Sequence, residues 1–149
     1  MPWANGRGET REIARHPADG EFTWRLSMAT VAEDAAFSRF PGVTRTLAVV
    51  DGGDLDLVVD GVSQRLRIGG PARTFSGEAA ASAAPAAGTV TDLNLMVRGG
   101  LRGSIEPFAG GPVDPGQDTV FLVLLDTRET ISVESPGEQP SGYLVRISA

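Results

Sequence analysis

The sequence contains no cysteine, no lysine and a single histidine among its 149 residues. Without cysteine, the chain cannot form a disulfide, a catalytic thiolate or a metal site that needs sulfur ligands. Without lysine, it cannot form a Schiff base with a substrate carbonyl. The thirteen basic residues are all arginine. These absences exclude the disulfide scaffolds, the cysteine enzymes and the Schiff-base enzymes.

Long apolar runs and basic clusters are also missing. No segment approaches the roughly 20 apolar residues that cross a bilayer, and the N-terminus has no basic region followed by an apolar one. A net charge of −6 leaves no concentrated basic surface for nucleic acid. We therefore expect a soluble, cytoplasmic protein of one domain, residues 1–149, with no nucleic-acid and no membrane partner.

Short apolar segments with a period of two residues, separated by glycine and proline, dominate the chain and predict an all-β sandwich or barrel. In residues 21–31 an apolar face alternates with a polar one: Phe22, Trp24, Leu26 and Met28 against Arg25, Ser27 and Ala29. Residues 89–98 place Val90, Asp92, Asn94, Met96 and Arg98 on one face and apolar residues on the other. Residues 120–125 are apolar throughout and predict a central strand. The alanine-rich residues 78–88 predict a strand of small side chains.

The first thirteen residues combine a glycine-rich turn with groups that recognise anions. Trp3 supplies a flat face, Asn5 an amide and Arg11 a guanidinium suited to a carboxylate. Gly6 and Gly8 allow the backbone N–H groups to turn toward a ligand. The alternative is a tight surface turn with Trp3 covering the core and Arg11 in solvent, and the residue types alone favour neither.

Four ordered stretches resemble the HutD/Ves family of cupin-like proteins. The first is Pro2-Trp3 with Asn5-Gly6, Gly8 and Thr10-Arg11-Glu12-Ile13; the others are residues 22–29, residues 37–42 with Arg45, and residues 92–96. The resemblance implies an all-β, cupin-like (RmlC-like jelly-roll) barrel, or a bicupin arrangement of two small β-barrels or sheets. Two departures are Arg7, where the family has a glycine, and Met1 next to Pro2, where the family has a short strand. We expect that strand to be lost or to precede Met1.

A cupin enzyme binds its metal through two or three histidines and a carboxylate. This chain offers only His16, which lies beside Pro17 and is expected to be a solvated loop residue. The same shortage excludes a Ser-His-Asp set. We therefore predict no metal, no cofactor and no assigned catalytic residue.

A ligand-binding set can be proposed instead, in which arginines bind carboxylates, polar groups bind other edges of the ligand and aromatic rings exclude water. The candidates are Trp3, Asn5, Arg11, Arg25, Ser27, Phe40, Arg45, Asp92 and Asn94. We expect Arg11 and Arg25 to converge with Asn5 and Asn94. The alternatives are that Arg25 and Ser27 face water, that Arg45 lies at an exposed strand end, and that Asp92 and Asn94 hydrogen-bond to buried backbone.

Three functions remain open from the sequence. The first is a protein that binds a small anionic metabolite; the resemblance implies a link to histidine catabolism and a ligand like N-formylglutamate. The second is a metal-free cupin enzyme, an isomerase or hydrolase of a small carboxylic acid, with Asp92 as acid or base. The third is a structural protein with no pocket. The sequence does not determine the oligomeric state.

Overall fold

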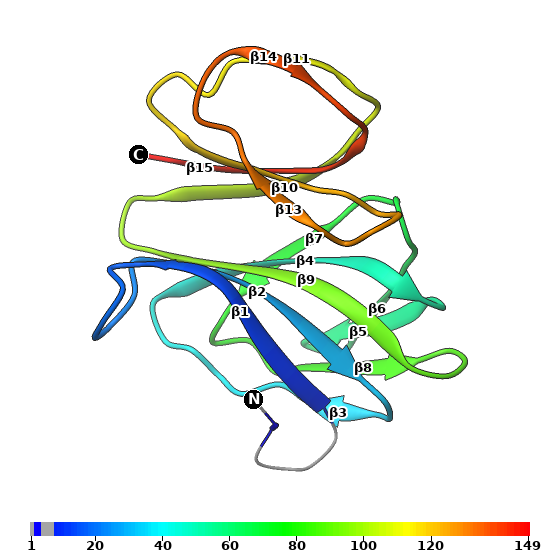
Figure 1. Cartoon of the computed structure of the whole chain (residues 1–149). Helices are drawn as coiled ribbons and strands as arrows, with labels where there is room; N and C mark the ends of the chain where they lie inside the picture. The colour runs from blue at the N-terminus through cyan, green and yellow to red at the C-terminus, as the bar shows by residue number, and fades with distance from the viewer. Residues whose placement is uncertain (1, 4–7) are drawn as a thin grey trace.

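The computed structural model describes residues 2, 3 and 8–149, and in this part of the chain all regular structure is β (Figure 1). Fifteen strands and no helix occur among these residues, which confirms the all-β prediction. The described residues accordingly include no helix that is long and apolar enough to span a membrane. Asn5 and the Gly6 to Arg7 turn lie outside the described residues.

The central layer is a five-stranded antiparallel sheet in the order β1-β2-β9-β4-β7 (Figure 1). Its strands are β1 (Gly8–His16), β2 (Trp24–Val31), β9 (Val90–Arg98), β4 (Val43–Gly52) and β7 (Arg73–Ser76). The strands that are neighbours in space are mostly not neighbours in sequence. Both faces of this sheet are covered by other strands, so the sheet separates two apolar cores.

A four-stranded sheet, in the order β3-β8-β5-β6, covers one face of the central layer. Its strands are β3 (Ala35–Ala36), β8 (Ala81–Pro85), β5 (Leu55–Val59) and β6 (Val62–Leu66). The predicted alanine-rich strand is confirmed as β8, whose small side chains permit close packing. Asp60 and Gly61 join β5 to β6 with φ angles of 47° and 83°, as expected for a two-residue hairpin. The two sheets form an open sandwich, so the expected barrel is not closed.

The C-terminal strands cover the other face of the central sheet (Figure 1). A sheet in the order β10-β15-β12-β13 contains β10 (Arg102–Phe108), β15 (Gly142–Ser148), β12 (Thr119–Val123) and β13 (Thr130–Ser132). A separate pair contains β11 (Gly111–Val113) and β14 (Gly137–Gln139). The Tyr143 hydroxyl is buried and donates a hydrogen bond of 2.7 Å to the Gly70 carbonyl, which joins the C-terminal strands to the loop after β6.

The predicted alternation of β2 holds for its apolar residues within the strand. Trp24, Leu26 and Met28 contact the core shared with the C-terminal strands. Phe22 is an exception, and its assignment to that face is wrong: it precedes β2 and packs against Val43 and Met96 on the opposite side. The turn that ends at Thr23 breaks the alternation, so the period cannot be extended backward from the strand.

The segment around residues 120–125 also differs in detail from its prediction. As expected, β12 is an internal strand that pairs with both β15 and β13. Val120, Leu122 and Val123 are buried, whereas Phe121 is only partly buried. Phe121 packs against Trp24 with ring centroids 5.8 Å apart, at the contact between the two halves of the chain.

Gly142 provides a test of how closely β15 approaches β12. A Cβ atom at this position would lie 2.2 Å from the Val123 carbonyl oxygen, a clash with backbone that no side-chain movement relieves. Gly142→Ala should therefore lower the free energy of unfolding by roughly 2 kcal/mol or more, measured by urea denaturation. The matched control is Gly137→Ala in β14, where a Cβ meets nothing within 4 Å. Equal stability of the two variants would contradict the close packing.

Candidate functional site

A cavity of about 570 Å³ lies against the polar face of β2, β9 and β4. Its floor includes Arg25, Ser27, Arg45, Asp92 and Asn94, which come from these three strands. Its walls include Ala36 at the end of β3, Phe37, Ser38 and Phe40 just after this strand, and the N-terminal residues 2 and 3. The cavity has the size and mixed lining typical of a small-molecule site.

The register of the three strands arranges this face in rows. From one end to the other, the rows are Ala29, Asp92 and Val49; Ser27, Asn94 and Leu47; and Arg25, Met96 and Arg45. The first row thus has the Asp92 carboxylate between two apolar side chains, and the second row has the Asn94 amide at its centre. The third row has an arginine on each side of Met96. Positive charge lies at one end of the site, and hydrogen-bond acceptors lie at the other.

Arg45 is buried among three phenylalanine rings, with 5% of its surface exposed. Its guanidinium carbon lies 4.9 Å from the ring centre of Phe37 and 5.5 Å from those of Phe40 and Phe75. Arg45 Nη1 donates to the Ser38 carbonyl at 3.2 Å, whereas Nε is buried and has no hydrogen-bond partner in the described part of the chain. The aromatic faces stabilise the cation, but they do not satisfy all of its donors. The interpretation of Arg45 as an exposed strand end is therefore wrong.

Asp92 and Asn94 place hydrogen-bond acceptors at the cavity. No residue in the described part of the chain donates a hydrogen bond of normal geometry to these acceptors. Both carboxylate oxygens of Asp92 and the Oδ1 atom of Asn94 are buried and make no hydrogen bond of normal geometry. Burial raises the pKa of Asp92 to about 7, against the opposing effects of the Arg45 guanidinium and the Ala29 backbone N–H. Burial likewise lowers the pKa of Arg45 to about 10, although Asp92 opposes this change. The Ala29 N–H is thus a backbone neighbour of Asp92, but none of these three oxygens makes a hydrogen bond of normal geometry to the described backbone.

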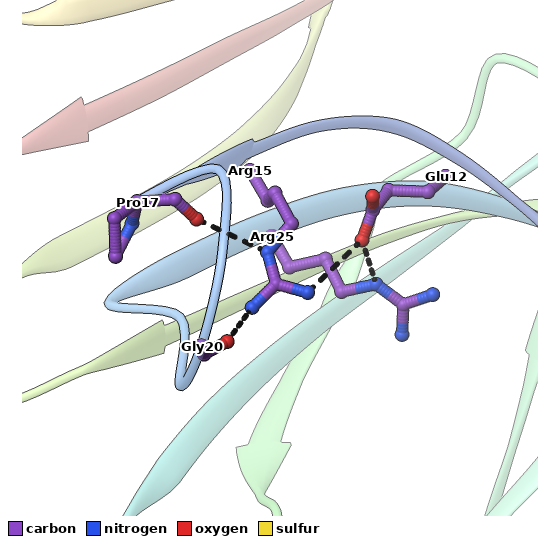
Figure 2. A network of polar contacts seen from close by, with 5 residues as sticks. All are labelled: Glu12, Arg15, Pro17, Gly20 and Arg25. Atoms are coloured by element: carbon purple, nitrogen blue, oxygen red, sulfur yellow. Dashed lines mark hydrogen bonds and ion pairs between the residues drawn. The ribbon is translucent and has the colours of Figure 1, made fainter.

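Arg25 is held at the rim of the cavity by a network on β1 (Figure 2). Arg25 Nε donates to Glu12 Oε1 at 2.9 Å, and Arg15 Nη1 lies 3.8 Å from the same oxygen. Arg15 is fixed in turn, since it donates to the carbonyls of Pro17, at 3.1 Å, and Gly20. Figure 2 shows the two terminal nitrogens of Arg25 pointing away from this network, and they hydrogen-bond to no described residue. Glu12 therefore orients Arg25, and the two terminal guanidinium nitrogens of Arg25 remain free to bind a ligand.

Trp3 covers the cavity from the N-terminal end of the chain. Its backbone N–H donates to the Gly8 carbonyl at 2.8 Å, and its indole Nε1 donates to Thr10 Oγ1 at 2.7 Å. Its ring meets the edge of Phe37 at 5.9 Å between centroids. A Cβ on Gly8 would lie 2.8 Å from the indole ring, so glycine is what allows Trp3 to fold back over β1.

Most of the predicted site residues gather at this cavity. The structure brings together Trp3, Arg25, Ser27, Phe40, Arg45, Asp92 and Asn94. Asn5 lies outside the described residues, so its predicted role stays a prediction. Ser27 is buried, and therefore does not face water as the alternative proposed.

Arg11 does not belong to this group, and its predicted convergence with Arg25 is wrong. Arg11 pairs with Met28 in the β1–β2 register, and its Nη2 donates to Met28 Sδ at 3.5 Å. Because Met28 packs in the core on the opposite face of the sheet, Arg11 lies on that face too. Thr10 points into the cavity instead, since side chains alternate along a strand.

Sequence reasoning missed Phe37, Thr10 and Met96 as cavity residues. Phe37 contacts both Trp3 and Arg45. Its segment has no regular period from which its direction could be predicted. Met96 could have been found, because it shares the predicted face of Asp92 and Asn94. The described residues include no group of three or more histidine, aspartate or glutamate side chains that could hold a metal ion.

Asp92→Asn tests the burial of the carboxylate through the pH dependence of stability. The pKa of Asp92 is about 7 in the folded protein and 3.8 in an unfolded chain, so only the folded state holds the proton between these values. The contribution of this group to stability is therefore largest below pH 4, falls as the pH rises to 7, and changes little above. Relative to the variant, the wild type should lose about 3 kcal/mol of unfolding free energy between pH 5 and pH 8, measured by urea denaturation.

The matched control is Asp56→Asn, at a partly exposed carboxylate on the outer hairpin that pairs with Arg65 at 2.9 Å. The side-chain hydrogen bond from Arg65 lowers the pKa of Asp56, the opposite direction from Asp92. This variant should keep the wild-type loss of stability between pH 5 and pH 8. A wild type and an Asp92→Asn variant with the same pH dependence would show that Asp92 is not buried as described.

Comparisons with known proteins agree with this architecture. A family model described as HutD matches residues 1–141. A Pseudomonas putida protein described as an uncharacterized 21.2 kDa protein in the hutC 3′ region is 41% identical over 98 residues, covering 64% of this chain and 52% of that protein. Protein Ves of Citrobacter koseri is 40% identical over 99 residues, covering 64% of this chain and 51% of Ves. The chain thus spans about half the length of these curated relatives.

Two solved structures extend the likeness to the fold. HutD from Pseudomonas fluorescens SBW25, in a formate condition, superposes with a TM-score of 0.77 at 26% identity, covering 99% of this chain and 90% of that one. The Cupin_2 domain of an XRE family transcriptional regulator from Enterobacter cloacae gives a TM-score of 0.54 at 15% identity, covering 62% of this chain and 98% of that domain. The predicted cupin-like fold is therefore confirmed as an open β-sandwich.

Proposed function

This chain belongs to the HutD family, and we propose that it binds a small organic acid in the cavity described above. The observation that carries the proposal is the row formed by Arg25, Met96 and Arg45. The two arginines are separated by two strand spacings, about 10 Å between their backbones, and both line one cavity. Each has guanidinium nitrogens without a partner among the residues that the structure describes, and guanidinium groups bind carboxylates with charge-assisted hydrogen bonds.

The surroundings of this row favour binding of an anion over a purely structural role. Trp3 and Phe40 line the cavity with apolar rings, and an apolar surrounding strengthens electrostatic attraction inside the site. A structural protein gains nothing from burying Arg45 with an unsatisfied donor, since that burial costs free energy. The cost is offset if a ligand carboxylate occupies the site.

The proposed ligand is an acidic metabolite of histidine utilisation, similar to N-formylglutamate. The name of the Pseudomonas putida relative places that protein beside hutC, and the Pseudomonas fluorescens homologue is itself named HutD. A dicarboxylic acid can place one carboxylate near each arginine. We propose that the protein modulates histidine utilisation by binding such an acid.

A second candidate function is a metal-free isomerase or hydrolase acting on the same class of acid. The observation that favours it is Asp92, a buried carboxyl group with a pKa of about 7, where a group can serve as both acid and base. Purified protein incubated with a panel of small acids would show turnover, lost in Asp92→Asn. Binding without turnover supports the binding protein instead.

Arg25→Ala tests the binding proposal most cleanly, because Arg25 lies at the rim and its loss should leave the core intact. We expect binding of N-formylglutamate to weaken by about 1.5–3 kcal/mol, the usual contribution of a charge-assisted hydrogen bond, measured by isothermal titration calorimetry. Arg11→Ala is the matched control, since Arg11 lies on the other face of the same sheet. Arg65→Ala, on the outer hairpin, should likewise leave binding unchanged.

The proposal would be wrong if the wild type bound none of a panel of small mono- and dicarboxylic acids. It would also be wrong if Arg25→Ala and Arg11→Ala weakened binding equally, because that result would place the ligand outside the cavity.

A further inference from the structure

We infer that the cavity selects acids that also carry a hydrogen-bond donor, an N–H or O–H group, and rejects acids of the same size that lack one. The inference rests on the proposed function and concerns the opposite end of the same site. Three acceptor atoms carry it, Asp92 Oδ1, Asp92 Oδ2 and Asn94 Oδ1, which are buried at the cavity and have no hydrogen-bond partner among residues 2, 3 and 8–149.

These atoms lie on the cavity face of the central sheet. Asp92 and Asn94 alternate with Leu93 and Leu95, which point into the opposite core, so both polar side chains share the cavity face of β9. Their neighbours on β2 and β4 are Ala29, Ser27, Val49 and Leu47, a set with a single hydroxyl donor. The side chains beside Asp92 in its row offer no donor at all. A bound molecule is therefore the natural source of the missing donors.

The acceptors and the arginines are arranged for two ends of one molecule. Asn94 lies two residues from Met96 along β9, a rise of about 6.7 Å, and Asp92 lies two residues further. Because the arginines flank Met96, a carboxylate held by them lies a few bonds from a group at Asn94. This distance fits a donor near the middle of a short-chain acid, on the second or third atom from the carboxylate.

The charge at this end of the site also discriminates between ligands. An ionised Asp92 repels a second carboxylate but accepts a hydrogen bond from an amide N–H or a hydroxyl. A site with buried acceptors loses free energy when an analogue leaves them unpaired, so it rejects the analogue more strongly than an apolar pocket would. Ligands with an amido or hydroxyl group beside the acid are therefore preferred over plain diacids.

The experiment uses two ligand pairs, and in each pair one acid carries the donor and the other lacks it. N-formylglutamate is compared with N-formyl-N-methylglutamate, and 2-hydroxyglutarate is compared with glutarate, by isothermal titration calorimetry on the whole protein. Each donor-bearing acid should bind about tenfold more tightly than its partner, the affinity ratio expected from one buried hydrogen bond. The hydroxyl pair separates loss of the donor from the added bulk of the methyl group.

Two variants assign the preference to these side chains. Asn94→Leu keeps the approximate size and removes the amide acceptor, and Asp92→Asn keeps the shape and removes the charge. In each variant the preference should shrink to about twofold or less, while affinity for glutarate stays the same or rises. Asp56→Asn on the outer hairpin makes the same chemical change away from the cavity and should leave the ratios unchanged. Circular dichroism thermal unfolding confirms that each variant is folded.

The outcomes separate this inference from the proposal on which it rests. If the wild type binds all four acids with similar affinity, the donor requirement is wrong and the proposed acid binding stands. If the preference exists but survives in both variants, the acceptors on β9 are not its source, and the inference is again wrong. If no acid binds at all, the proposed function fails, and the inference fails with it.

Discussion

Desolvation of charged and polar groups on the cavity face of β9 and β4 is the constraint around which the rest of the structure is built. Arg45, Asp92 and Asn94 each have a buried polar atom to which no described residue hydrogen-bonds. Such burial destabilises a fold unless other contacts offset it. The opposite face of β9, with Leu93 and Leu95 in a large apolar core, provides those contacts. One strand therefore holds the site on one side and the stabilising core on the other.

Much of this arrangement could be predicted from a period of two residues. In residues 24–31 and 90–98, alternation separated the cavity face from the core face, because side chains of a strand point to opposite sides in turn. The same rule failed for Arg11, where residue types did not show which of two adjacent polar residues faced the cavity. The bulge between Glu12 and Ala14 also interrupts the alternation of side-chain directions along β1, so the direction of one residue does not predict that of residues beyond the bulge.

Other features depend on information that local periodicity does not contain. Arg25 and Arg45 flank Met96 only because β2, β9 and β4 are adjacent, although β9 follows the other two by many residues in the chain. Phe22 and Phe37 lie in irregular segments, where no period indicates their direction. The family resemblance supplies part of the missing information, because its motifs come from segments that are distant in the sequence and lie together in the fold.

The two-sided burial of the central sheet has a consequence for how the chain folds. If translation or proteolysis ended the chain after β9, the apolar face that contains Leu26, Met28 and Leu95 would be turned toward water. Tyr143 would also no longer anchor the loop at Gly70. We therefore expect that residues 2–98 do not fold without the C-terminal strands. We expect the central sheet and the strands β10 to β15 to unfold in one cooperative transition. The C-terminal strands then stabilise the sheet that bears the site by covering its apolar face.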